Sequence, residues 1–264
     1  ERASKFAGPY RIIEVGVKPL RAKDKIKSRR EIWWQFAVRA AAIHKAMEEA
    51  GAAVVVTVVS KYGLPVRIDA GSVISSAAAI CPDPSFSRLA QMSSPCHNAW
   101  AWQWGSTMKS DLRYNPSDVF DTYPFLNPSD ELEGLGSELD SVRKKAMAER
   151  GLGLTKFYNR LNDSGLSDSD DPLVAAVRVL HRQIDEAVIR GYGWDDLDLE
   201  YGFHPFPSME RWTVSPAVRL ELLDRLLEEN HKRAAAEGPR GGHEKRSGRT
   251  TRIDSQDGLF GAIE

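Results

Sequence analysis

A short polar run after three tryptophans carries the side chains in this sequence that are best suited to recognition chemistry. Lys109, Asp111 and Arg113 occupy alternating positions, so from an extended loop their side chains would point the same way. Lysine and arginine donate to guanine in the major groove of DNA, and aspartate accepts from the cytosine amine. The three residues are therefore candidates for reading bases. The alternative interpretation is a polar surface loop that follows core aromatic residues.

The tryptophans before this run favour packing over binding. Trp100 and Trp104 are four residues apart within a predicted helix over residues 86–104, and this spacing is typical of a buried helical face. Pro95 is expected to kink or divide that helix.

A basic cluster near the start of the chain is the second candidate site. Residues 1–50 hold 12 Lys/Arg against 6 Asp/Glu, and residues 127–210 hold 9 against 17, although the formal net charge of the whole chain is only -1. This asymmetry suggests that the basic end meets a polyanion, for which we expect the cluster to bind phosphates. A solvated loop is the alternative. The cluster comprises Lys18, Arg21, Lys23, Lys25, Lys27, Arg29 and Arg30.

Motifs that would make the chain a self-contained catalyst are missing from the sequence. No glycine-rich loop follows a predicted strand, and neither Asn115-Pro116 nor Asn127-Pro128 continues into the second proline and aromatic residue of amino-methylating enzymes. Cys96 and His97 are adjacent on a predicted helix and would point apart, so they do not form a thiol–imidazole pair. We expect no metal site, because the histidines lack ligand spacing. His97 and His181 are expected to make local hydrogen bonds within helices.

The pattern of apolar residues predicts an α+β chain whose first part, residues 1–126, is mixed α/β. Strands are expected at residues 10–17, 52–59, 65–68 and 72–80. A helix capped by Ser28 should run to Gly51. Residues 109–125 are polar and rich in aromatics and proline, which favours an ordered loop.

The second part, residues 127–236, is predicted to be mainly helical. One helix is expected over residues 130–150, weakened by Gly134 and Gly136. Asp171-Pro172 and Ser215-Pro216 each predict a capped helix start. Residues 237–264 read as a disordered tail. The two cysteines, Cys81 and Cys96, show no disulfide or metal spacing, which fits a reducing cytoplasm, and no apolar run is long enough for a membrane span.

Six stretches resemble one protein family in their order along the chain. They are residues 8–19 (GPYRIIEVGVKP), 28–36 (SRREIWWQF), 105–125 (GSTMKSDLRYNPSDVFDTYPF), 151–159 (GLGLTKFYN), 187–197 (AVIRGYGWDDL) and 214–217 (VSPA). The chain resembles the C-terminal part of MmeI-like restriction-modification and adenine-specific DNA methyltransferases. That part comprises a target recognition domain and a helical C-terminal domain. The absence of an initiator methionine suggests a piece cut from a longer polypeptide.

The resemblance implies a module for sequence-specific recognition of double-stranded DNA. The methyltransferase core, with its S-adenosylmethionine site, would lie upstream, so no cofactor and no catalytic residue are expected in this segment. In the family the run before the Arg-Tyr and Tyr-Pro-Phe motifs bears the base-reading side chains, and the matching positions are Lys109, Asp111 and Arg113. The resemblance also implies a role in restriction-modification or phage defence.

Two other function classes remain open on the sequence. One is a specificity or adaptor subunit acting in trans on a separate methyltransferase; a reading frame fused upstream, or ending before Glu1, would discriminate the two. The other is a protein-interaction module with an incidental basic patch, which would not bind duplex DNA at low salt.

A separate tail motif, with Gln256, Leu259 and Phe260, resembles peptides that dock weakly on bacterial sliding clamps.

Overall fold

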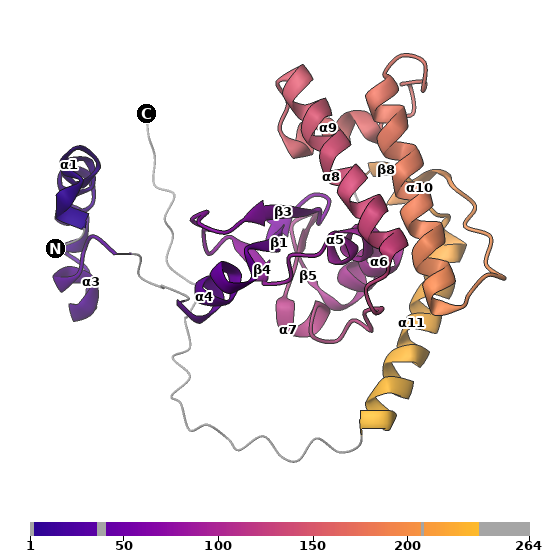
Figure 1. Ribbon diagram of the computed structural model, residues 1–264, viewed down its shortest axis with the longest axis horizontal. Coiled ribbons are helices and arrows are strands. Elements are labelled where there is room, and N and C mark those ends of the chain that lie inside the picture. Colours follow the sequence, from indigo (N-terminus) through magenta and orange to yellow (C-terminus); the bar gives the residue numbers. More distant parts are fainter. Residues whose placement is uncertain (1–2, 36–40, 207–208, 238–264) are drawn as a thin grey trace.

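The computed structural model describes residues 3–35, 41–206 and 209–237 of the 264-residue chain, and they form helices with three small antiparallel sheets (Figure 1). The predicted α+β class is therefore confirmed. The strand orders are β3-β1-β4, β2-β6-β5 and β7-β8. None of the described helices is long and apolar enough to cross a membrane.

The first sheet is built around a strand that is buried on both faces. β1 (Ala52–Thr57) pairs antiparallel with β3 (Pro65–Asp69) and with β4 (Ala78–Cys81). Val54 and Val56 enter the main core, whereas Ala53 and Val55 pack with Met47 of α4 (Ala41–Ala50). The continuous apolar run of the sequence is the signature of such a strand, and the strands predicted at residues 52–59 and 65–68 are confirmed. Only the end of the strand predicted at 72–80 forms.

The N-terminal segment is helical, which corrects the predicted strand at residues 10–17. A short 3-10 helix η1 (Ala3–Lys5) precedes α1 (Ala7–Gly16), α2 (Lys18–Arg21) and α3 (Lys27–Glu31). Residues 10–17 have no strand partner among the described residues, and a helix satisfies its own backbone hydrogen bonds. The predicted helix from Ser28 to Gly51 was also wrong, because α3 ends at Glu31 and Ser28 lies inside it. The predicted end at Gly51 is confirmed by its left-handed φ of 80°.

Two helices and a second sheet complete the mixed part. α5 (Phe86–Ser93) and α6 (Pro95–Trp104) are separated at Ser94, so Pro95 divides the predicted helix and stands at the first position of the second half. The sheet contains β2 (Val59–Ser60), β5 (Ser106–Met108) and β6 (Asp111–Arg113). Helix α7 (Pro116–Val119) follows. The predicted loop over residues 109–125 thus contains a strand and a short helix.

The second part is mainly helical, as predicted, with one hairpin that the sequence did not indicate. Its helices are α8 (Asp130–Arg150), α9 (Leu154–Leu161), α10 (Pro172–Tyr192) and α11 (Pro216–Glu237). Strands β7 (Gly202–Phe206) and β8 (Met209–Thr213) lie between the last two helices in the chain. The expected caps are present, since Asp171 and Ser215 accept hydrogen bonds from the amides of Val174 and Val218.

The main core extends across the predicted boundary at residues 126 and 127. It reaches from Val54 of β1 to Leu226 of α11. The Glu133 carboxylate of α8 accepts hydrogen bonds from the first amides of α5, at 3.1 and 2.7 Å. Gly136, expected to weaken α8, instead allows close helix packing, because a Cβ there would lie 2.1 Å from the Phe86 carbonyl oxygen. The division into two domains stays a prediction, but the two parts pack as one body.

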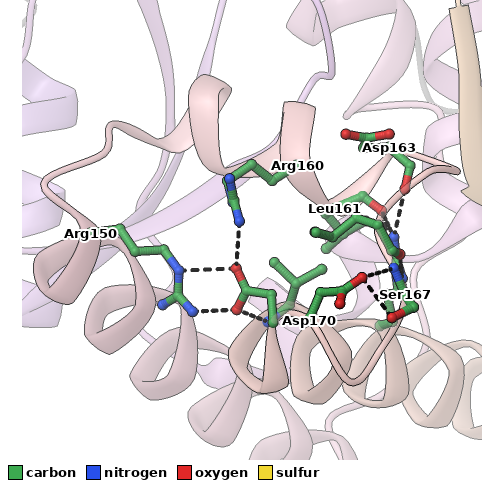
Figure 2. Close-up of polar contacts among 10 residues, drawn as sticks. Arg150, Arg160, Leu161, Asp163, Ser167 and Asp170 are labelled. Atoms are coloured by element: carbon green, nitrogen blue, oxygen red, sulfur yellow. Dashed lines mark hydrogen bonds and ion pairs between the residues drawn. The ribbon is translucent and has the colours of Figure 1, made fainter.

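A charged cluster around the start of α10 ties three helices of the second part together. Figure 2 shows Arg150 from the end of α8 and Arg160 from α9 pointing toward the same carboxylate. Their hydrogen bonds identify it as the side chain of the buried Asp171. Burial disfavours its ionised form, but hydrogen bonds from the Val174 amide, Arg160 and Arg150 outweigh this and lower the pKa of Asp171. Because the cap and both ion pairs meet at one side chain, it fixes the relative positions of these helices.

Candidate nucleic-acid interface

The three predicted base-reading residues lie on one β-hairpin, which we call the 106–113 hairpin. Its strands pair with Ser106 opposite Arg113 and Met108 opposite Asp111, and the connection is only two residues long. Lys109 is the first residue of that turn, with a left-handed φ of 57°. The extended loop expected from the sequence was therefore wrong. The three residues are brought together, but Lys109 lies at the tip and only Asp111 and Arg113 share a strand.

The two sides of β6 have different environments. Leu112 is 1% exposed and belongs to the main core, whereas Arg113 is exposed and Asp111 is half-buried. Side chains alternate along a strand, so Asp111 and Arg113 lie on the side opposite to Leu112. Gly63 permits the leucine to pack, because a Cβ there would lie 2.8 Å from Leu112 Cδ2. One buried side chain thus anchors a strand whose other side is available to a partner.

The exposed surface of this hairpin is polar, with two apolar exceptions. Its first strand and its turn, residues 106–110, are exposed throughout. Met108 is 48% exposed, and Trp104, which ends α6 just before the hairpin, is 43% exposed. The packing predicted for the tryptophans is confirmed for Trp100, which is buried and donates from Nε1 to Thr122 Oγ1 at 3.1 Å. For Trp104 it is confirmed in part, because its ring lies against Trp100 while the remainder of the side chain is exposed.

A buried arginine from the second part of the chain contacts the residue that follows β2 of this sheet. Arg211 of β8 is 5% exposed, and its guanidinium stacks 3.7 Å from the centroid of the Phe206 ring. Its Nη2 donates to the Lys61 carbonyl oxygen, directly after β2, at 2.5 Å. Burial lowers the pKa of Arg211 to about 10, while Tyr62 and Asp111 favour its charged form. The side chain is therefore protonated at neutral pH and places a positive charge near Asp111. No local pattern in the sequence indicates this residue, since it lies about 100 positions away from the hairpin.

The basic cluster lies on α2, α3 and the turn between them, and neighbouring carboxylates pair with some of its cations. Lys18 Nζ pairs with Glu14 at 2.8 Å and lies 5.2 Å from the centroid of the Trp33 ring. Lys27 pairs with Glu31 and Arg29 pairs with Asp24. Arg21 and Arg30 instead donate to the backbone carbonyl oxygens of Gln35 and Asp24. Lys23 and Lys25 make no ion pair within the described part of the chain. Arg21 and Arg30 also lack an ion pair there, so the charges of these four residues are available to a phosphate.

The histidine and cysteine side chains serve packing rather than chemistry. His97 and Cys96 are buried, and burial lowers the pKa of His97 to about 3 and raises the pKa of Cys96. The expected local hydrogen bond is present for His97, which bonds to the Met92 backbone, but the expectation was wrong for His181. His97 Nε2 lies 3.1 Å from Tyr114 Oη after β6, and His181 Nε2 lies 2.7 Å from Tyr158 Oη of α9. Cys81 and Cys96 are free thiols. Among the described residues, no group of three or more His, Cys, Asp or Glu could hold a metal ion.

Comparison with known proteins bears out the family resemblance. Residues 11–127 match the family model of the target recognition domain of MmeI. A structure of the Type IIL restriction-modification enzyme MmeI in complex with DNA shares the fold, with a TM-score of 0.53 and 16% sequence identity. The similarity covers 89% of this chain and 28% of that enzyme. A search of curated proteins gives no significant match.

Proposed function

We propose that this chain is the sequence-specific recognition module of a restriction-modification enzyme that methylates adenine in double-stranded DNA. The observation that carries the proposal is the 106–113 hairpin inside a target recognition domain of the MmeI type. It presents Lys109, Asp111 and Arg113 to solvent above the buried Leu112. A hairpin of this width fits the major groove, where charged side chains of both signs can discriminate base pairs.

In this proposal, reading bases and binding the backbone are separate tasks. The hairpin reads base edges, and the basic cluster binds phosphates and sets the register on the duplex. An exposed lysine at the tip can donate to guanine N7 and O6, and the neighbouring carboxylate can accept from the cytosine amine of the same pair. Opposite charges on the two side chains limit the cost of removing either from water.

Methyl transfer itself belongs to another domain of the same polypeptide, acting on an adenine that it extrudes from the duplex. The described sheets of this chain are antiparallel throughout and offer no strand-turn-helix seat for S-adenosylmethionine. We therefore expect the cofactor in the methyltransferase domain and no transferase activity from this segment alone. Cytoplasmic function in phage defence follows from the same proposal. Detectable transfer of labelled methyl groups to DNA by the purified segment would contradict it.

Selection of binding sites from random duplexes tests recognition directly. The immobilised complete polypeptide is expected to enrich one short motif, and a Lys109→Ala/Asp111→Ala/Arg113→Ala variant should lose the enrichment while it still binds DNA. Binding without enrichment by the unmodified protein would reduce the function to nonspecific DNA binding. No binding at low salt would contradict the proposal and favour a protein-interaction module.

Two finer features of the sequence stay proposals. A trans-acting specificity subunit would restore methylation when it is mixed with a separate methyltransferase, whereas a fused module would not need mixing. The clamp-like motif with Gln256, Leu259 and Phe260 lies outside the described residues. If a sliding clamp retained the intact tail and the Leu259→Ala/Phe260→Ala tail equally, that interaction would be contradicted.

A further inference from the structure

Lys61, beside the 106–113 hairpin, is bonded to the second part of the chain through both its side chain and its backbone. Lys61 directly follows β2, which pairs with β6 so that Val59 lies opposite Arg113 and Ser60 opposite Leu112. Continuing this register by one residue places the Lys61 backbone at the level of Asp111. Lys61 is therefore next to the side chains proposed to read bases, on the strand beside them.

The ammonium group of Lys61 is positioned without being neutralised. Its Nζ donates to Asn159 Oδ1 of α9 at 2.9 Å and lies 5.2 Å from the centroid of the Tyr62 ring. The same amide oxygen accepts a hydrogen bond from Tyr62 Oη at 2.8 Å. No carboxylate of the described residues lies within 4.0 Å of Lys61 Nζ, so the positive charge has no ion-pair partner there.

The backbone of the same residue is also fixed. The Arg211 guanidinium, buried against Phe206 and Tyr62, donates to the Lys61 carbonyl oxygen at 2.5 Å. A free lysine side chain loses rotamer freedom when a binding partner orders it. Asn159 and Arg211 already order Lys61 in the free protein. Little further conformational freedom is therefore lost when a ligand binds.

We infer that Lys61 is a further DNA-contacting residue that binds a backbone phosphate beside the base pair read by the hairpin, and that Asn159 of the helical part positions it. The inference rests on the proposed function. A lysine acts on phosphate as a point charge, and Lys61 directly follows β2, an edge strand of this sheet, with its side chain bonded to α9. The helical part thereby sets the register of the hairpin on the duplex.

The salt dependence of duplex binding by the complete polypeptide tests the inference. Lys61→Met keeps the aliphatic stem and removes the charge. The slope of log affinity against log salt should fall by about 0.9, the value expected when one phosphate is no longer neutralised, while the selected motif stays the same. Lys232→Met, which removes an exposed lysine paired with Glu229 on α11, is the matched control and should leave the slope unchanged.

A double-mutant cycle separates positioning from folding. Asn159→Ala should weaken DNA binding in the parent protein, and this effect should vanish in the Lys61→Met background, because the amide acts on DNA only through the lysine. A purely structural role would persist in both backgrounds. An unchanged slope for Lys61→Met, or a changed base in the selected motif, overturns the inference. Failure of the parent protein to bind any duplex overturns the proposed function instead.

Discussion

The basic cluster and the 106–113 hairpin both expose cations, but the chain supports them in different ways. The cluster lies on helices of four and five residues with no buried side chains, and its acidic neighbours pair with several of its cations. The hairpin carries fewer charges, yet Leu112 anchors it in the main core and the buried Arg211 bonds to the residue after the neighbouring strand β2. Charge density alone attracts a polyanion, whereas discrimination between bases requires side chains at fixed positions. The comparison therefore supports the proposal that the first region contributes affinity and the second contributes specificity.

Removing the anchor of the hairpin should have the largest effect. Leu112→Ala deletes a fully buried side chain, and we expect the free energy of unfolding to fall by roughly 2–5 kcal/mol. Chemical denaturation of the parent and the variant measures the difference. Neutralising Lys23 and Lys25 should leave the unfolding free energy within about 0.5 kcal/mol of the parent, as is usual for surface substitutions. If both changes lowered the unfolding free energy equally, the hairpin would not be better anchored than the basic cluster, which would contradict the comparison.

Exchanging the charges of the hairpin should alter one base position. Lys109→Asp with Asp111→Lys should change the preferred base pair there, and the parent base pair should be bound about 1–3 kcal/mol more weakly at that position. Aspartate tolerates the left-handed backbone at residue 109 better than most residues. Competition binding against duplexes that differ at one base pair measures the discrimination. A Lys109→Gly control suits the turn but removes the side chain, so it should lose discrimination without gaining a new preference.

Neutralising the basic cluster should weaken binding to all duplexes equally. For Lys23→Gln, Lys25→Gln and Lys27→Gln together, the log–log salt slope should fall by about 0.9 for each phosphate that the variant no longer binds. Lys27 pairs with Glu31 at 3.7 Å, so its share is expected to be the smallest. The control is Lys144→Gln, Lys145→Gln and Lys232→Gln, which removes the same charge from the helical part. A slope that changes as much in the control would assign the effect to net charge.

The contribution of Asp171 to the stability of the helical part should depend on pH. Its pKa is lowered in the folded protein, so the carboxylate stabilises the fold above its unfolded pKa, and this contribution is lost as the pH falls through the folded pKa. Asp171→Asn should reduce the unfolding free energy by about 1 kcal/mol at pH 7, the typical value for a lost hydrogen bond. Below a pH of about 4 the difference from the parent should shrink. A difference that stays constant from pH 7 to pH 3 would show that the charge is not responsible.

The sequence predicted those elements whose local signals agree with their tertiary environment. The apolar run of β1 and the Asp171-Pro172 start of α10 are examples. A strand buried on both faces requires consecutive apolar residues, and a capped helix start requires a residue such as aspartate. The residues 10–17 alternate like a strand, but a strand also requires a partner, which no local pattern reports. The base-reading candidates came from residue types and the family resemblance. The turn at Lys109 and the buried Arg211 depend on distant packing that the sequence does not display.

Sequencing of methylated sites in cells that express the complete polypeptide tests the division of roles most directly. Three forms should be compared: the parent, the Lys109→Asp/Asp111→Lys exchange, and the Lys23→Gln/Lys25→Gln/Lys27→Gln variant. We expect one methylated motif in the parent, a motif altered at a single position in the exchange, and the parent motif at reduced occupancy in the cluster variant. An unaltered motif in the exchange, or an altered motif in the cluster variant, would contradict the assignment of specificity to the hairpin.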